Sequence, residues 1–154
     1  MMVTSRENQK AAALAVSDGF WLLHADGASL GNPGSGGAGA VIYDDQGRVA
    51  AEISQPLGPA VTNNEAEYQA LLLGLDRLRS LGIGKIRIRL DSELVVRQVK
   101  GEYKVKNPRL AVFFRQVMDL LAGFETYDIA HVWRELNRAA DALASQAAAG
   151  ERSN

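Results

Sequence analysis

The order of apolar and polar residues along the chain predicts alternating strands and helices. Short runs in which apolar residues cluster, or alternate with polar ones, favour strands. These runs cover 20–25, 38–43, 49–57, 85–91 and 126–133. Helical patterns cover 62–81, 92–100, 109–122 and 137–149. The segment 27–39 contains six glycines and Pro33, which is typical of a loop or tight hairpin.

Individual residues mark where these elements begin and turn. Thr62 and Glu65 have the spacing of a capping box, which starts a helix. Residues 45–47 supply a turn between the second and third strands. The element order is therefore βββαβααβα. Strands joined through helices favour parallel pairing, so we expect an α/β domain with a mixed five-stranded sheet and helices on its faces.

Length and composition indicate one globular domain. The chain has 154 residues, of which 47% are hydrophobic and 23% charged, and these values exclude wholesale disorder. We expect the domain to cover 19–150, with an N-terminal tail at 1–18 and a C-terminal tail at 151–154. Since no apolar run approaches the length of a membrane span, we expect a cytoplasmic protein with no membrane partner. We also expect a monomer.

The scarcity of cysteine and histidine narrows the chemistry. The chain has no cysteine and two histidines, which excludes disulfides, zinc–thiolate sites, cysteine nucleophiles and a three-histidine metal site. Any metal must be held mainly by carboxylates, and these favour Mg²⁺ or Mn²⁺. The net charge of −1 provides no overall basic field for nucleic acid, although a local basic patch is compatible with it.

Four acidic residues occupy positions that are unusual for ordinary surface acids. Asp26 ends an apolar strand, Asp91 follows the fourth strand, Glu67 lies near the apolar stripe of the long helix, and Asp141 lies early in the last helix. Each has a structural alternative, because aspartate is common in turns and caps and acids stabilise the first turn of a helix. If the four converge, their mutual repulsion would be relieved by divalent cations, and paired ions suit phosphoryl chemistry.

The four acids fall in motifs that resemble those of the type-1 ribonuclease H family. The segments 26–39 (DGASLGNPGSGGAG), 62–68 (TNNEAEY), 90–95 (LDSELV) and 137–144 (NRAADALA) resemble its four motifs in order and spacing. The resemblance implies the ribonuclease H-like fold, in its compact bacterial and archaeal form. The segment 101–108 is too short for the basic protrusion that some members insert after the third motif.

The resemblance implies endonucleolytic hydrolysis of the RNA strand of RNA–DNA hybrids by two Mg²⁺ ions, leaving 5′-phosphate and 3′-hydroxyl ends. Asp26, Glu67, Asp91 and Asp141 would be the catalytic, metal-binding residues. It also implies that the glycine-rich hairpin and the start of the long helix contact the hybrid. That contact set is Ser29, Asn32, Thr62, Asn63 and Asn64. Locally, these residues equally suit a hairpin and a helix start, and Ala60 replaces a basic residue often found near the phosphate pocket.

A basic segment supports nucleic-acid binding independently of the resemblance. Lys104, Lys106 and Arg109 are the candidate contacts, and Lys100 and Arg115 flank them. Such side chains contact phosphates without choosing a sequence. An ordinary solvated loop is the alternative. Lys85, Arg87 and Arg89 alternate with apolar residues and are expected on one face of the sheet.

The histidines and one tryptophan have weaker assignments. His131 lies ten residues before Asp141, where the family often has a proton-shuttling histidine, but its segment has the pattern of a strand. We keep it as a candidate catalytic residue beside a structural alternative. His24 is expected to pack near the site. Trp133 is expected in the core rather than as a stacking platform.

Three other functions remain open. A hybrid-binding module of the same fold would lack turnover. Another nuclease of the wider superfamily would cut DNA junctions or free DNA ends. A structural domain would use the four acids only as caps and turn residues.

Overall fold

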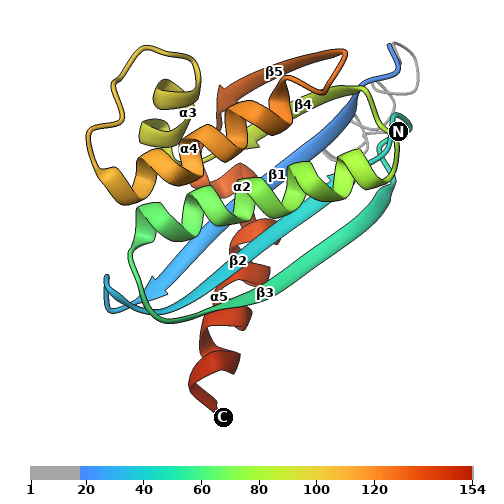
Figure 1. Cartoon of the computed structure of the whole chain (residues 1–154). Helices are drawn as coiled ribbons and strands as arrows, with labels where there is room; N and C mark the ends of the chain where they lie inside the picture. The colour runs from blue at the N-terminus through green and yellow to red at the C-terminus, as the bar shows by residue number, and fades with distance from the viewer. Residues whose placement is uncertain (1–17, 154) are drawn as a thin grey trace.

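The computed structural model describes residues 18–153 (Figure 1). Of the expected N-terminal tail, all but Asp18 lies outside the described residues. The elements are β1 (Trp21–Leu30), β2 (Gly34–Tyr43), β3 (Val49–Val61), α2 (Asn63–Ser80), β4 (Lys85–Leu90), α3 (Glu93–Val99), α4 (Pro108–Leu121), β5 (Thr126–His131), a 3-10 turn (Arg134–Leu136) and α5 (Arg138–Ser153). Their order confirms βββαβααβα.

The strands form one mixed sheet in the order β3-β2-β1-β4-β5. The first three pair antiparallel as a meander, and β1–β4 and β4–β5 pair parallel. This confirms the expected mixed five-stranded sheet. β1 is the central strand of this sheet, and it contacts α2 on one face and α5 on the other (Figure 1).

Helices cover both faces of the sheet. α2 packs on β1 and β2 and has α4 beside it, whereas α5 packs across β1, β2 and β3 from the opposite side (Figure 1). Leu71, Leu75 and Leu78 of α2 are fully buried. Their burial confirms the apolar stripe that predicts this helix and places the main core between α2 and the sheet.

The glycine-rich segment 27–39 forms a tight hairpin, which is one of the two predicted alternatives, and the alternative of an open loop is wrong. β1 continues to Leu30 and β2 begins at Gly34, leaving a turn of only three residues. The glycines are also needed for close packing. A Cβ atom at Gly37 or Gly39 would lie 2.2 Å from a backbone oxygen of α5. Glycine therefore allows a helix to approach the strand more closely than any other residue would.

Element ends otherwise follow the sequence closely. The Thr62–Glu65 capping box is present at the start of α2, and the turn at 45–47 separates β2 from β3. β5 ends at His131, two residues earlier than expected, and β3 continues to Val61. The last helix extends to Ser153, into the residues expected as a C-terminal tail. Within the described part of the chain, no helix is long and apolar enough to cross a membrane.

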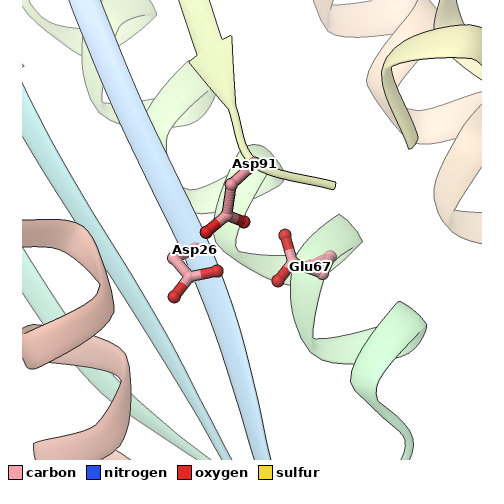
Figure 2. Close-up of side chains that lie close together, drawn as sticks. All are labelled: Asp26, Glu67 and Asp91. Atoms are coloured by element: carbon pink, nitrogen blue, oxygen red, sulfur yellow. The ribbon is translucent and has the colours of Figure 1, made fainter. Parts of the chain in front are cut away.

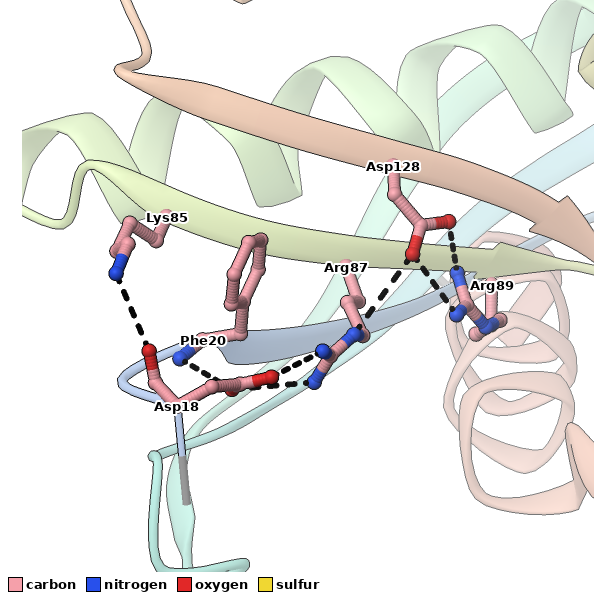
Figure 3. Close-up of polar contacts among 6 residues, drawn as sticks. All are labelled: Asp18, Phe20, Lys85, Arg87, Arg89 and Asp128. Atoms are coloured by element: carbon pink, nitrogen blue, oxygen red, sulfur yellow. Dashed lines mark hydrogen bonds and ion pairs between the residues drawn. The ribbon is translucent and has the colours of Figure 1, made fainter. Parts of the chain in front are cut away.

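The basic residues of β4 lie on the face of the sheet that also carries α5. Arg87 pairs with Asp18 and Asp128, and an Arg89 nitrogen lies 3.0 Å from an Asp128 oxygen (Figure 3). Lys85 donates to the backbone oxygen of Asp18. These contacts confirm a charged sheet face, and they neutralise its two arginines locally.

Candidate active site

Three carboxylates from three different elements meet where β4 ends beside the middle of β1. Asp26 comes from β1, Asp91 directly follows β4, and Glu67 projects from α2 (Figure 2). One oxygen of each lies within 4.8 Å of the others. The parallel register of β1 and β4 explains why Asp26 and Asp91 are neighbours, because Ala25 pairs with Leu90 and each aspartate is the next residue.

Glu67 reaches the cluster because α2 approaches β1 very closely. A Cβ atom at Gly27 would lie 2.2 Å from the carbonyl carbon of Ala66, so only glycine fits there. The Gly27 backbone N–H donates to Glu67 Oε1 at 3.1 Å. The other oxygen, Oε2, is buried and has no hydrogen-bond partner in the described structure. A buried carboxylate oxygen without a partner is costly, and a bound cation would remove that cost.

Asp141 lies beside this cluster in the first turn of α5. Gly39 pairs with Asp26 across the sheet, and its Cα faces Ala140, so the same close approach brings Asp141 near Asp26. Arg134 Nη2 lies 3.9 Å from an Asp141 oxygen. The structure therefore brings all four predicted acids to one region, with three in a tight group and Asp141 adjacent.

The ionisation of Asp26 and Glu67 is strongly disfavoured. Burial raises the pKa of Asp26, and a hydrogen bond and like charge from Glu67, together with Asp141 and Asp91, raise it further. Burial also raises the pKa of Glu67, against the opposing effect of its hydrogen bonds to Asp26 and Gly27. By itself, the cluster therefore retains a proton at pH values where isolated carboxyls are ionised.

The donor set fits a divalent cation that prefers oxygen. Asp26, Glu67 and Asp91 supply hard carboxylate oxygens within reach of one ion, and no cysteine or histidine is in the group. The partnerless Glu67 Oε2 provides a second, independent reason to expect a positive ligand. The described residues thus contain a candidate metal centre at the positions that the sequence identified.

A buried amide joins the two sides of the site. Asn137 is 1% exposed. Its Nδ2 donates to the Ala25 carbonyl at 3.0 Å, and its Oδ1 lies 3.2 Å from His24 Nδ1. The Asn137 carbonyl in turn accepts from the Asp141 backbone N–H. His24 packs near the site, as expected. The bridging role of Asn137 was not predicted; its position directly before the last helix was the available signal.

The predicted hairpin contacts form a network with the start of α2. Ser29 Oγ donates to the Val61 carbonyl and accepts from the Asn32 backbone N–H. Asn32 Oδ1 accepts from the Asn63 backbone N–H at 2.9 Å. These bonds fix the hairpin beside α2, which is the local alternative that the sequence left open. Asn32 and Asn63 are nevertheless exposed, and Asn64 is partly exposed.

Thr62 and the basic segment meet through Glu65. Thr62 Oγ1 accepts from the Glu65 backbone N–H at 3.2 Å, and Arg109 Nη2 lies 3.1 Å from Glu65 Oε2. Arg109 therefore brings a cation to the start of α2, although Ala60 provides none. Lys104 and Lys106 lie exposed on the loop before α4.

The prediction that Trp133 lies in the core is wrong. Its side chain is 72% exposed, in the loop that joins β5 to α5. His131 is the last residue of β5, and its ring meets the Trp133 ring edge-on at a centroid distance of 5.3 Å. His131 is not among the three residues whose ligand atoms gather. Its catalytic role stays a prediction.

Comparisons with known proteins agree with this geometry. A family model described as reverse transcriptase-like matches residues 24–147. The chain is 41% identical over 122 residues to ribonuclease HI of Halobacterium salinarum, covering 79% of this chain and 61% of that protein. A crystal structure of RNase H1 from that organism superposes with a TM-score of 0.82 at 38% identity, covering 86% and 99% of the two chains.

Two further relatives bear on function. The chain is 42% identical over 127 residues to a bifunctional protein of Mycobacterium tuberculosis, covering 82% of this chain and 35% of that protein. The crystal structure of an LC11-RNase H1 in complex with an RNA/DNA hybrid matches with a TM-score of 0.79 at 36% identity, covering 84% and 97% of the two chains. The chain thus spans about a third to three-fifths of the two curated relatives' lengths.

Proposed function

The chain belongs to the type-1 ribonuclease H family, and from this premise we propose that it is a metal-dependent endonuclease that hydrolyses the RNA strand of RNA–DNA hybrids. The observation that carries the proposal is the convergence of Asp26, Glu67 and Asp91, with Asp141 beside them and a partnerless oxygen on Glu67. A module that only binds the hybrid has no use for such a costly cluster. The hybrid in the related LC11-RNase H1 structure supports the substrate.

The proposed reaction is hydrolysis of a phosphodiester. Water adds to phosphorus, the bond from phosphorus to the 3′ oxygen breaks, and the products carry a 5′-phosphate and a 3′-hydroxyl. The four carboxylates would hold Mg²⁺, with Mn²⁺ as a substitute. Such ions, when bound in pairs, activate water and neutralise charge on the leaving oxygen. The protein's part is to fix the carboxylates: the Gly27 backbone N–H donates to Glu67, and the Asn137 side chain ties the start of α5 to the Ala25 carbonyl of β1.

Recognition of the hybrid would use its backbone and shape, since the 2′-hydroxyl is what distinguishes RNA from DNA. We propose Ser29, Asn32, Asn63 and Asn64 as the groove contacts, because the hydrogen bonds that tie the hairpin to α2 hold them as one rigid surface. Thr62 accepts a capping bond, which leaves its hydroxyl proton available to a phosphate.

The basic residues would supply the electrostatic part of the binding. Arg109 lies beside Thr62 through Glu65, and its side chain is 73% exposed. Lys104 and Lys106 are exposed on the neighbouring loop. Phosphate contacts of this kind increase affinity without selecting a sequence.

Turnover in the presence and absence of metal tests the proposal. The protein is incubated with a labelled hybrid in Mg²⁺, in Mn²⁺ or in EDTA, and with a DNA duplex of the same sequence. We expect internal cuts in the RNA with either metal and none in EDTA or in the DNA duplex. Binding of the hybrid without cleavage would favour the binding module, and cleavage of the DNA duplex would favour another nuclease of the superfamily.

A further inference from the structure

The loop between β5 and α5 displays the most exposed large apolar side chains of the described residues. Trp133 is 72% exposed and Leu136 is 59% exposed. The Leu136 backbone N–H donates to the Trp133 carbonyl, so the two residues belong to one turn. An exposed tryptophan paired with a leucine is costly in water and marks a surface that contacts another molecule.

Both ends of this loop are fixed beside the carboxylates. At its start, the Val132 backbone N–H donates to the carbonyl of Leu90, the residue before Asp91. At its end, Asn137 donates to the carbonyl of Ala25, the residue before Asp26. The exposed turn between them is therefore held at the edge of the acidic cluster.

The loop also has a defined shape and charge. The edge-on contact with His131 orients the Trp133 ring. Arg134, the next residue, lies close to Asp141, yet its side chain is 79% exposed. Arg138 is exposed one residue beyond the anchor. Arg134 directly follows the aromatic residue, and the exposed Glu135 comes next. An aromatic ring beside an arginine suits a sugar–phosphate backbone, because the ring packs on sugars and bases while the cation faces a phosphate.

We propose that Trp133 is a substrate-contact residue, whose indole packs against the nucleic-acid strand that lies at the carboxylates. This inference rests on the proposed function and adds a contact that the family motifs do not include. The loop's continuity with the acidic cluster selects nucleic acid, rather than another protein, as the molecule that covers the indole. The contact would raise affinity for the hybrid and leave the chemical step unchanged.

Tryptophan fluorescence tests the contact directly. The chain has two tryptophans, and Trp21 lies five residues before Asp26, about 17 Å away along β1. In a Trp21→Phe, Asp91→Asn protein, the signal reports Trp133 alone and the hybrid stays uncut. We expect the hybrid to change the emission and to shield the indole from acrylamide. A Trp133→Phe, Asp91→Asn protein, which retains Trp21, should show neither effect.

Kinetics provide the second readout. We expect Trp133→Ala to raise the KM for the hybrid about tenfold, with kcat within about twofold, because one aromatic contact to nucleic acid typically has an effect of this size. Trp133→Phe should restore most of the affinity. Leu81→Ala is the matched control, since Leu81 is 46% exposed at the far end of α2.

The outcomes separate this inference from the proposed function. The contact is overturned if bound hybrid does not change the access of acrylamide to Trp133, or if folded Trp133→Ala has the KM of the original protein. Neither result affects the proposed function, provided that the unmodified protein cleaves the hybrid. If the unmodified protein neither binds nor cuts the hybrid, both conclusions fall. Shielding of the indole together with the raised KM supports the contact.

Discussion

Asp26 lies beside the close approach of α2 at Gly27 and pairs with Gly39, where α5 approaches β2. Burial and its acidic neighbours raise its pKa, and burial does the same for Glu67. In both residues the ionised form is the disfavoured one. The site is therefore less stable than a neutral core would be, which is a recurrent feature of catalytic centres.

Burial of these carboxyls, together with the acids around them, makes the stability of the metal-free protein depend on pH. A raised pKa means that the folded state binds the proton more tightly than the unfolded state does. Its contribution is complete below the ordinary carboxyl pKa and is lost as pH rises through the pKa values of the folded cluster. We expect the free energy of unfolding in EDTA to fall between pH 5 and pH 8, as measured by urea denaturation.

Glu67→Gln should reduce that dependence. The amide cannot ionise, so the variant should be more stable than the original protein in EDTA at pH 8, by about 0.5–2 kcal/mol, and should lose activity. Glu93→Gln, on the exposed side of α3, is the control. An equal pH dependence in the original protein and Glu67→Gln would contradict the assignment of the proton to this cluster.

The Asn137 side chain ties the start of α5 to β1. Asn137→Ala leaves the buried Ala25 carbonyl without its donor, which should lower the free energy of unfolding by about 1–3 kcal/mol. It should also lower the affinity for Mg²⁺, because the start of α5 is no longer fixed to β1. Calorimetric titration with Mg²⁺ checks this at a temperature where the variant is folded. Wild-type metal affinity there would show that Asn137 stabilises the fold without positioning the acids.

At the scale of elements, three glycines set how closely the helices approach the sheet. Gly27 allows α2 to pack closely on β1, and Gly37 and Gly39 allow α5 to pack closely on β2. We expect Gly39→Ala to lower the free energy of unfolding by about 1–3 kcal/mol through overpacking, and to lower activity by moving Asp141 away from Asp26. Gly150→Ala is the matched control in α5, because a Cβ atom there meets nothing within 4 Å. Thermal unfolding and hybrid cleavage of both variants measure the effects.

These glycines also show where sequence reasoning ends. The order of the elements, the capping box at Thr62 and the apolar stripe of α2 follow from local patterns, and the structure confirms them. The hairpin of the glycine segment follows too, but the close packing of its glycines does not, since they contact helices that lie far away in sequence. A local pattern cannot distinguish a glycine that permits a turn from one that permits close packing.

The same distinction applies to the site. The sequence context identified each acid as a candidate, although Asp26 lies within β1 and does not end a strand as expected. Their convergence depends on the order β1-β4 and on the approach of two helices. Trp133 was misplaced for a related reason. Its strand-like surroundings indicated burial, but β5 ends at His131 and leaves the indole in a loop.

At the scale of the whole molecule, the net charge of −1 means that binding must depend on local charge. We expect hybrid affinity to fall with salt, and Lys104→Gln with Lys106→Gln to reduce the slope of log Kd against log salt by about 1.5. Arg77→Gln with Arg79→Gln removes the same charge at the last turn of α2 and is the control. Equal slopes for the two double variants would show that Lys104 and Lys106 do not contact the hybrid.

If the carboxylate cluster hydrolyses the RNA strand of a hybrid, cleavage must be confined to that strand and must depend on the acids of the cluster. A hybrid labelled differently on its RNA and DNA strands is incubated in Mg²⁺ with the original protein, with Asp91→Asn and with Asp119→Asn. Asp119 is an exposed acid on α4, so its variant makes the same chemical change outside the cluster.

We predict RNA fragments with 5′-phosphate and 3′-hydroxyl ends, an intact DNA strand, and a rate more than about a hundredfold lower for Asp91→Asn only. Cleavage of the DNA strand, equal rates for Asp91→Asn and Asp119→Asn, or uncut RNA with folded original protein would contradict the claim.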